Sequence, residues 1–210
     1  PYRGGEIEPL LRHGNARAIV CGGAAESYDA PATMLGLKKK IETLENVIIA
    51  TGNVPAETLS LQSLIDKGTM APIEEAPVAS DPAILCFTSG TSNAPKAVVH
   101  NHQTLLANNR ITAPIYNMTS DDIVLGGPPF THAFGICVLN FTLMVGASAL
   151  LMPAFTPPAL MELIEKGQPT VLFVAPAHIA ACGKAGLLEN CDLSSVRIAT
   201  ISGSTCPPEV

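Results

Sequence analysis

Short apolar runs alternate with longer segments of helical periodicity along most of the chain. The runs are rich in aliphatic and β-branched residues and are bounded by glycine, proline or polar residues, which is typical of strands. They predict strands at 18–21, 47–50, 84–87, 98–100, 123–126, 147–152, 171–174 and 196–201. Helical patterns lie at 6–13, 60–66, 102–110, 133–144, 158–166 and 176–184. This alternation predicts an α/β fold with largely parallel sheets flanked by helices.

The segment from Ile123 to Met161 carries no Asp, Glu, Lys or Arg. Its part from Ile136 to Phe155 is apolar enough to suggest a transmembrane helix. However, Gly146 and Pro153 interrupt the run, and Gly146 separates a helix-like half from a β-like half. A buried helix followed by a buried strand accounts for both the interruption and the lack of charge, so we favour it over a membrane span.

A loop rich in glycine and hydroxyl side chains lies between the apolar run at 83–87, which predicts a buried strand, and a second short strand at 96–100. It reads Thr88-Ser89-Gly90-Thr91-Ser92-Asn93-Ala94-Pro95-Lys96. Small residues let backbone N–H groups approach an anion closely, hydroxyls donate further hydrogen bonds, and Lys96 supplies a point charge. The loop therefore predicts a phosphate-binding site. Composition alone fits a solvated Ser/Thr-rich hairpin equally well.

The Walker phosphate loop is one alternative for this segment. Gly90 and Lys96 meet its Gly-to-Lys spacing. Pro95 stands where that motif has its second glycine, and Ala97 stands where it has the Mg²⁺-binding Ser or Thr. The order of residues therefore disfavours a Walker loop.

The loop instead resembles the signature of the adenylate-forming (AMP-binding) superfamily, which includes acyl-CoA synthetases, luciferases and the adenylation domains of peptide synthetases. That signature runs Thr-Ser-Gly-Thr-Thr-Gly-x-Pro-Lys-Gly-Val and is followed by a histidine. The chain matches it at Thr88, Ser89, Gly90, Thr91, Pro95, Lys96, Val98 and His100, with Ser92 for the second threonine. Asn93 and Ala97 replace two of its glycines. Asparagine tolerates positive φ, whereas Ala97 requires an ordinary β conformation.

Two later segments resemble the same superfamily and follow in the same order. Residues 129–135, Pro-Phe-Thr-His-Ala-Phe-Gly, resemble its Pro-x-Phe-His-x-x-Gly element, in which an aromatic or histidine side chain lies beside the reacting carboxylate. A histidine in an apolar run is otherwise typical of the core, which is the alternative for His132. Residues 198–210 resemble the stretch that contacts adenine, with Ser204 and Thr205 in place of Gly-Ala.

The resemblance implies an enzyme that activates a hydrophobic carboxylic acid with ATP and Mg²⁺ and passes the acyl group to coenzyme A. It assigns ATP binding to Thr88, Ser89, Gly90, Thr91, Ser92, Asn93, Lys96, Gly203, Ser204 and Thr205. It assigns catalytic roles to His132 and Lys96, and the acyl pocket to Phe134, Gly135, Val174, Pro176 and His178. No metal ligand is assigned within the chain. A luciferase-like enzyme, an adenylation domain with another acceptor and a truncated, non-catalytic scaffold stay open as alternatives.

The resemblance covers the whole chain but less than half of a typical family member. Residues 1–210 are accordingly expected to form part of the N-terminal AMP-binding domain, with the C-terminal domain absent. The family's Mg²⁺-binding glutamate, ribose-binding aspartate and C-terminal lysine are then expected beyond Val210, so we expect the fragment by itself to be inactive.

Composition limits the partners and the compartment. The net charge is −6 at pH 7 and no stripe of Lys and Arg occurs, which argues against a nucleic-acid partner. The 6 cysteines are spread out with no Cys-x-x-Cys, and the start is not signal-like, so we expect reduced thiols in a cytoplasmic protein. His100 and His102 lack a nearby Cys or carboxylate partner, which favours exposed histidines over a metal pair. The sequence leaves the oligomeric state open.

Overall fold

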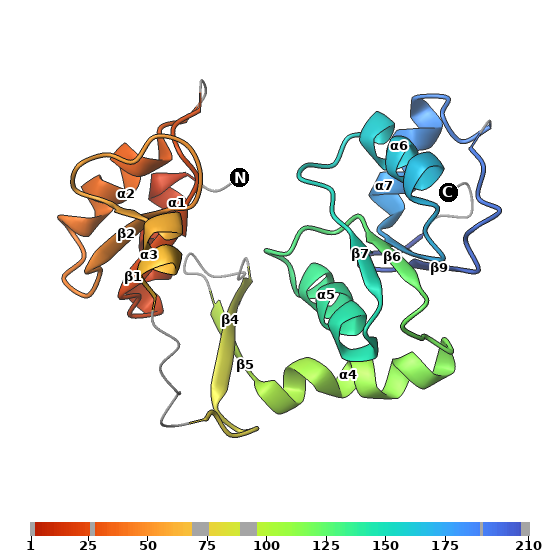
Figure 1. Ribbon diagram of the computed structural model, residues 1–210, viewed down its shortest axis with the longest axis horizontal. Coiled ribbons are helices and arrows are strands. Elements are labelled where there is room, and N and C mark those ends of the chain that lie inside the picture. The colour runs from red at the N-terminus through yellow and green to blue at the C-terminus, as the bar shows by residue number, and fades with distance from the viewer. Residues whose placement is uncertain (1–2, 26–27, 69–75, 89–95, 190, 207–210) are drawn as a thin grey trace. The chain divides into compact units, whose positions relative to one another are not determined.

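The computed structural model describes residues 3–25, 28–68, 76–88, 96–189 and 191–206 (Figure 1). Strands and helices alternate along them, and the larger sheets are parallel, so the predicted α/β class is confirmed. The chain divides into two compact units, residues 1–78 with 83–99, and residues 79–82 with 100–210. Its six cysteines, all in the described part of the chain, form no disulfide.

The first unit contains a parallel sheet of order β1-β2-β3. Its elements are α1 (Gly4–His13), β1 (Ala18–Cys21), α2 (Ala30–Lys38), β2 (Asn46–Ile49), β3 (Leu59–Ser60) and α3 (Leu61–Lys67). Helix α2 begins at an Asp29 cap, whose carboxylate accepts from the Ala32 N–H at 2.9 Å. Buried aliphatic residues from α2, the following turn and β2 form the core, namely Met34, Leu37, Ile41, Leu44, Val47 and Ile49.

Strands β4 (Pro82–Thr88) and β5 (Lys96–Asn101) form a separate two-stranded sheet. Ala97 lies within β5, in the β conformation that its replacement of glycine requires. The prediction that 83–87 is buried is wrong, because no residue of β4 is buried and Leu85 is 39% exposed. A contact with α1 joins the rings of Phe87 and His13 at 6.0 Å. An apolar run does not by itself distinguish such a partly covered strand from a buried one.

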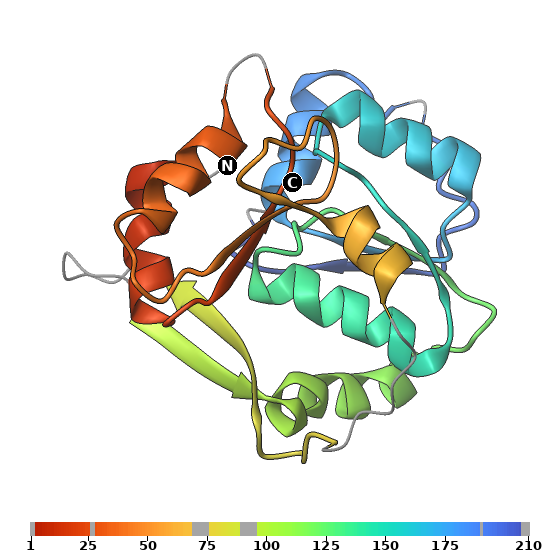
Figure 2. The ribbon, with the colours of Figure 1, turned by 60° about the vertical axis from the view of Figure 1, so that its left-hand side comes forward.

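The second unit is a parallel sheet of order β7-β6-β8-β9 with helices on both faces (Figure 2). Its elements are α4 (His102–Ile115), β6 (Ile123–Gly126), α5 (Ala133–Val145), β7 (Ser148–Leu150), α6 (Pro157–Gly167), β8 (Val171–Val174), α7 (Pro176–Lys184) and β9 (Ile198–Ile201). One core lies between the sheet and α4 and α5, and includes Val124, Val138, Phe141 and Phe173. The other lies beneath α6 and α7, and includes Leu125, Ile164, Leu172 and Cys182.

A polar clamp joins the amino ends of these strands. Asp122, just before β6, accepts from the Arg197 Nη2 at 2.6 Å and from the Thr170 Oγ1 at 2.6 Å. Arg197 also donates to the backbone carbonyl of Tyr116 at 2.9 Å, at the end of α4. The hydrogen bond from Arg197, followed by the other donors, lowers the pKa of Asp122 to about 2. The clamp therefore fixes the register of β6, β8 and β9 at the end of the sheet opposite the loops described below.

The charge-free segment forms α5 and β7. Helix α5 ends at Gly146, which has the left-handed φ of 74° that favours glycine. Val138 and Phe141 of α5 are buried, as expected. Strand β7 is shorter than predicted and lies at the edge of the sheet, with no buried residue, so the expected buried strand is wrong. No helix within the described residues is long and apolar enough to cross a membrane.

Candidate functional site

The loops that leave the carboxyl ends of β6 and β8 turn to opposite faces of the sheet. After β6 the chain enters α5 on one face, and after β8 it enters α7 on the other (Figure 2). Strands β6 and β8 are direct neighbours, paired in parallel from Val124 with Val171 onwards. In open α/β sheets, ligands bind at such a reversal of strand order, outside the carboxyl ends. This end of the second unit is therefore its candidate site.

His132 caps the N-terminus of α5 at this end of the sheet. Its Nδ1 accepts from the Phe134 N–H at 3.1 Å, and the side chain is exposed. The alternative of a core histidine is therefore not what the structure shows. Because Nδ1 accepts a hydrogen bond, the neutral ring carries its hydrogen on Nε2, which presents a donor.

Gly135 is buried where α5 passes the preceding loop. A Cβ at Gly135 would meet the backbone of Pro129, and it would lie 2.8 Å from the carbonyl oxygen of Pro128. The position therefore needs glycine so that the first turn of α5 can approach the Pro128–Pro129 backbone closely. This contact fixes the direction in which α5, and with it His132, leaves the loop.

His178 fills the space between the loops that follow β6, β7 and β8. Its Nδ1 accepts from the Ala175 N–H at 3.0 Å, and its ring packs at a tilt of 54° against Phe155, with centroids 4.4 Å apart. A Cβ at Gly127 would lie 2.8 Å from Nδ1, so only glycine leaves room for the ring. Burial lowers the pKa of His178, and the neutral ring carries its hydrogen on Nε2.

The turn after β9 approaches the start of α5. Gly203 has a φ of 98°, which favours glycine, and a Cβ there would lie 3.9 Å from the Phe134 ring. Phe134 in turn packs edge-on against Phe173 of β8, with ring centroids 6.2 Å apart. Two residues to which the sequence assigns different roles, adenine contact for Gly203 and acyl pocket for Phe134, thus lie beside each other.

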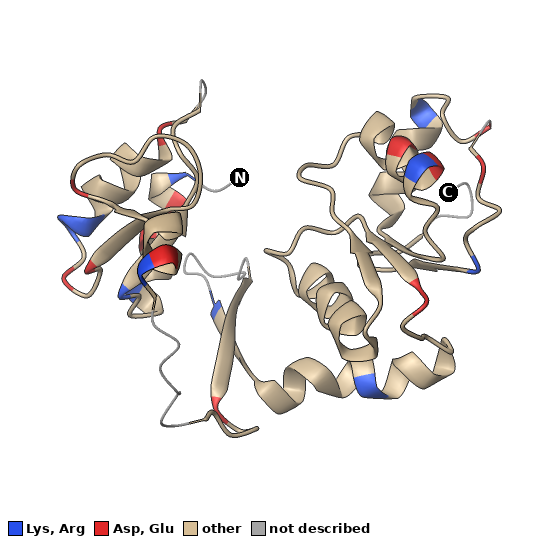
Figure 3. Ribbon diagram, viewed as in Figure 1, with Lys and Arg blue, Asp and Glu red and all other residues tan. Residues whose placement is uncertain are grey.

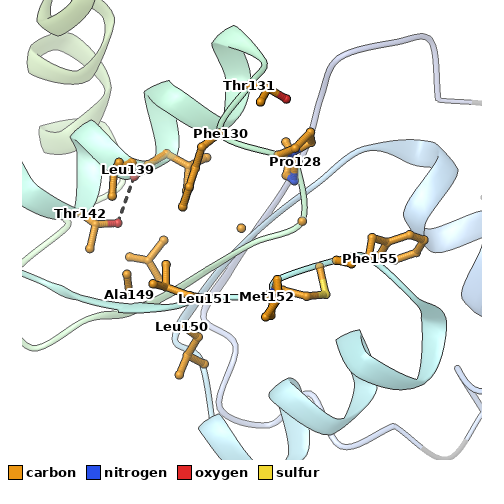
Figure 4. A pocket seen from close by; sticks show the side chains of 17 residues that line it. Pro128, Phe130, Thr131, Leu139, Thr142, Ala149, Leu150, Leu151, Met152 and Phe155 are labelled. Carbon is orange, nitrogen blue, oxygen red and sulfur yellow. Dashed lines mark hydrogen bonds between the residues drawn. The ribbon is translucent and has the colours of Figure 1, made fainter. Parts of the chain in front are cut away.

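An apolar cavity of about 620 Å³ opens next to these loops, between α5 and β7 (Figure 4). Its lining comes from the carboxyl end of β6, the loop to α5, one side of α5 and the chain from β7 to Phe155. The side chains that line it include Phe130, Thr131, Val138, Leu139, Thr142, Ala149, Leu151 and Met152. No charged residue occurs in α5 or β7 (Figure 3). A volume in the range of roughly 300–1,000 Å³ and an apolar lining are typical of small-molecule sites.

The predicted acyl-pocket residues do not line this cavity. Phe134, Gly135, Val174, Pro176 and His178 lie at the same end of the sheet, and three of them are buried in the packing of the unit. Their role in holding an acid stays a prediction. Sequence reasoning missed the residues that line the cavity. All of them come from the charge-free segment between Ile123 and Met161, and its lack of charge was the signal that could have identified them.

Some of the predicted ATP-binding residues lie in the described part of the chain and others lie outside it. Thr88 ends β4 and Lys96 begins β5 in the first unit, and both are exposed. Ser89, Gly90, Thr91, Ser92 and Asn93 lie outside the described residues. Gly203, Ser204 and Thr205 form an exposed turn after β9. Among the described residues, no group of three or more His, Cys, Asp or Glu side chains could hold a metal ion.

The site offers hydrogen-bond donors and little charge. The N-termini of α5 and α7 both lie at the carboxyl ends of the strands, where the positive end of each helix dipole favours an anion. The rings of His132 and His178 each add an Nε2–H group, because Nδ1 of each ring accepts a hydrogen bond. An anionic head beside an apolar cavity is therefore the ligand for which this end of the sheet is suited.

Helices on both faces, a reversal of strand order and an adjacent cavity define a ligand-binding α/β domain of the doubly wound kind. The sequence profile of the AMP-binding enzymes matches residues 1–210, the whole chain. The chain belongs to this family, as the resemblance of its loop and of two later segments predicted.

Characterised relatives of the chain are acid–CoA ligases. Benzoate–CoA ligase of Thauera aromatica is 32% identical over 215 aligned positions, covering 98% of this chain and 38% of the relative. Long-chain-fatty-acid–CoA ligase of Bacillus subtilis is 34% identical over 133 residues, covering 62% of this chain and 24% of the relative. Medium-chain fatty-acid–CoA ligase of Escherichia coli is 27% identical and is covered over 32% of its length. The chain thus spans about a quarter to two fifths of these relatives.

Solved structures show the same fold. The chain superposes on an anthranilate CoA ligase in complex with anthranoyl-AMP with a TM-score of 0.84 and 21% identity, covering 98% of this chain and 40% of that one. A long-chain-fatty-acid-CoA ligase from Archaeoglobus fulgidus gives a TM-score of 0.83 and 24% identity, with coverage of 99% and 40%. At these identities the likeness establishes the fold.

Proposed function

We propose that the enzyme containing this chain activates a hydrophobic carboxylic acid with ATP and transfers the acyl group to coenzyme A. The match of the whole chain to the AMP-binding enzymes carries the proposal. A carboxylate oxygen attacks the α-phosphorus of ATP, the bond to the bridging oxygen breaks, and pyrophosphate leaves. The coenzyme A thiol then loses its proton and attacks the acyl carbon, and AMP leaves with the electron pair of the broken carbon–oxygen bond.

The loop from Thr88 to Lys96 holds the β- and γ-phosphates in this proposal. Negative charge builds on the transferring and leaving phosphates, so fixed N–H and hydroxyl donors and one ammonium stabilise the transition state. The exposure of Thr88 and Lys96 supports this role. Gly203, Ser204 and Thr205 flank the adenine, and the open turn that Gly203 makes supports their assignment.

His132 orients the carboxylate of the acid. Its place at the N-terminus of α5 supports the role, because the helix end and the Nε2–H both favour a negatively charged oxygen there. The uncharged surroundings of α5 strengthen these donors, since less water and fewer ions compete with them.

Mg²⁺ is the family's expected partner of ATP. The described residues offer no cluster of carboxylates that suits it, so we assign none of them to the metal. The phosphate loop and His132 therefore carry the roles that this chain itself supplies.

Mass spectrometry of a reaction without coenzyme A tests the proposal. Enzyme, ATP, Mg²⁺ and an aliphatic acid should yield acyl-adenylate and pyrophosphate, and later addition of coenzyme A should convert the adenylate to thioester and AMP. Production of ADP, or of no adenylate with any hydrophobic acid, would contradict acid activation. Formation of the adenylate without thioester would show that the acceptor is another thiol or another reactant.

A further inference from the structure

Helix α5, which carries His132 at its N-terminus, packs against α4 (Figures 1 and 2). Two residues of α4 are buried, Asn109 and Ala113, and their spacing of one helical turn places them on the same face of the helix. Ala113 belongs to the apolar core that includes Val138 and Phe141 of α5. Asn109 is 0% exposed. A polar side chain buried to this extent requires hydrogen-bond partners.

Both partners of the Asn109 carboxamide belong to Cys137 of α5. The Asn109 Nδ2 donates to the Cys137 backbone carbonyl at 2.7 Å, and the Cys137 Sγ donates to the Asn109 Oδ1 at 3.3 Å. The neighbouring Asn108 Nδ2 donates to the same Sγ at 3.5 Å. One buried carboxamide of α4 is thus satisfied by two atoms of a single residue on the facing helix.

These hydrogen bonds define the position of α5 along α4. Apolar contacts, such as those of Val138 and Phe141, are non-directional and specify the position of a helix less sharply. A hydrogen-bonded carboxamide is directional, and one buried asparagine between helices can specify a single register. A shift of α5 by one residue, ~1.5 Å along its axis and ~100° around it, would separate Asn109 from both Cys137 atoms. The carboxamide would then be buried without partners, which is costly.

The same register determines where His132 lies. Cys137 follows His132 by five residues, which is about 7.5 Å of helix at ~1.5 Å per residue. The His132 Nδ1 accepts from the Phe134 N–H of the same helix, so the ring moves with α5. Gly135 allows the start of α5 to approach the preceding loop, whereas Asn109 holds the helix against α4 farther along. A displacement of α5 is therefore also a displacement of the His132 Nε2–H.

We infer that Asn109 is a positioning residue, which holds α5 in the register that places the Nε2–H of His132 at the carboxyl end of the sheet. The inference rests on the proposed function for the role of His132 as a donor to the acid. Asn109 itself touches no substrate, because it is fully buried beside α5. It acts only through Cys137 and the helix that joins Cys137 to His132.

The NMR signal of the His132 ring tests the position without any measurement of activity. The chain has 5 histidines, and in a sample with 13C-labelled histidine the signal that disappears in His132→Asn belongs to His132. Asn109→Leu removes both hydrogen bonds and replaces the carboxamide by an apolar side chain of the same branching. It should shift or broaden the His132 signal and leave the signal of His13, in the first unit, unchanged.

Kinetics of the enzyme that contains residues 1–210 test the consequence. Asn109→Leu should raise the KM for the acid and lower kcat/KM roughly 10–100-fold, because a misplacement on the order of 1 Å is enough for such a loss. The KM for ATP should stay nearly unchanged. A smaller folded fraction alone would lower kcat and change neither KM. In a His132→Asn background, Asn109→Leu should have no further effect, because the donor that Asn109 positions is absent.

Thr112→Val is the matched control on the same helix. It removes a hydroxyl from a partly buried position of α4, but this hydroxyl donates to the Asn108 carbonyl of its own helix at 2.8 Å. The His132 signal and both KM values should therefore stay as in wild type. Asn109→Ala removes the same two hydrogen bonds with a smaller side chain, and we expect the same changes as for Asn109→Leu. Circular dichroism identifies any variant that does not fold.

An unchanged His132 signal in folded Asn109→Leu would overturn the inference, as would equal effects of this variant in the wild-type and His132→Asn backgrounds. Unfolding of both Asn109 variants would also overturn it, since the residue would then be needed for the fold and not for the register. A displaced His132 signal combined with unchanged kinetics for the acid would confirm the positioning and refute the role of His132 in the proposed function.

Discussion

Lys96 is the only lysine in a long stretch of the chain that is otherwise almost free of charge. Between Pro82 and Ser120, Arg110 carries the only other full charge. In the proposed function this ammonium binds phosphate, and no carboxylate near it in the sequence competes for it. Its position at the start of β5, directly after the hydroxyl-rich loop, gives it a fixed backbone and an exposed side chain.

Lys96→Ala should therefore slow adenylation, with a loss on the order of 10²-fold for a donor aimed at the charge of the transition state. The rate of acid-dependent pyrophosphate release in a coupled assay measures the loss. Lys39→Ala removes an equally exposed lysine from the end of α2 and serves as the control. Equal rates in both variants would remove Lys96 from the phosphate site.

His132 caps α5, and in the proposed function it is also a hydrogen-bond donor to the acid, so the two roles can be separated by mutation. His132→Ala should lower kcat or raise the KM for the acid, on the order of 10²-fold in kcat/KM, and leave the KM for ATP nearly unchanged. Asparagine is a strong N-cap residue but has no Nε2–H, so His132→Asn should keep the stability and still lose activity. Full activity of His132→Asn would show that the histidine acts only as a cap.

The start of α5 depends on Gly135, which packs closely against the backbone of the preceding loop. Gly135→Ala should destabilise the second unit by about 1–3 kcal/mol, because the new methyl group meets Pro129 and Pro128. Gly36→Ala, within α2, has nothing within 4 Å and should be neutral or stabilising by up to ~1 kcal/mol. Urea unfolding of both variants gives the comparison. Equal stabilities would contradict the close contact at Gly135.

The clamp at the opposite end of the sheet predicts a pH dependence. The pKa of Asp122 is lowered to about 2 in the folded protein, below its value in the unfolded chain, so its ion pair stabilises fully above about pH 4. This contribution, about 2 kcal/mol, is lost as the pH falls through the folded pKa. Asp122→Asn should lower the Tm at neutral pH, and the difference from wild type should shrink below about pH 4.

Asp121→Asn provides the control for the clamp. Asp121 is the exposed neighbour of Asp122, and its change should leave the Tm and its pH dependence close to those of wild type. A constant difference between Asp122→Asn and wild type down to pH 2 would contradict the assigned pKa. Such a result would show that Asp122 stabilises the fold through the packing of its side chain and not through its charge.

Strands at the centre of the second sheet could be predicted almost to the residue. The fully buried β8 matches its predicted bounds, as do β1, β6 and α7. Helix α2 and the two-residue β3 were missed. Gly36 interrupts the helical pattern of α2, and the apolar residues of α2 are not confined to one face. Strand β7 was predicted too long, because an apolar run gives no sign of where the pairing with a neighbour stops.

The loops at the candidate site could be predicted from motifs, whereas the cavity could not. His132 and Gly203 stand in segments whose residue order is characteristic of the family. The cavity arises from the pairing of Ala149 with Val124 and from the distance between β7 and α5. Neither is encoded in a local pattern, because each depends on which residues meet after folding.

Charged residues are distributed unevenly along the chain, and one long segment contains none. The 12 basic and 18 acidic residues leave the segment from Ile123 to Met161 without any. This segment contributes the β6–α5 loop, α5, β7 and nearly all of the cavity lining. In the proposed function this uncharged wall favours a hydrophobic acid, and the adjacent helix N-termini and the Nε2–H of His132 attract its head.

Exchange of isotopically labelled pyrophosphate into ATP tests whether this chain belongs to an acid-activating enzyme. Reversal of adenylate formation returns the label to ATP, and it requires bound acid but no coenzyme A. We expect exchange that depends on an aliphatic acid and saturates with the concentration of that acid. Exchange that proceeds equally without acid, or no exchange with any hydrophobic acid in the enzyme that contains residues 1–210, would contradict it.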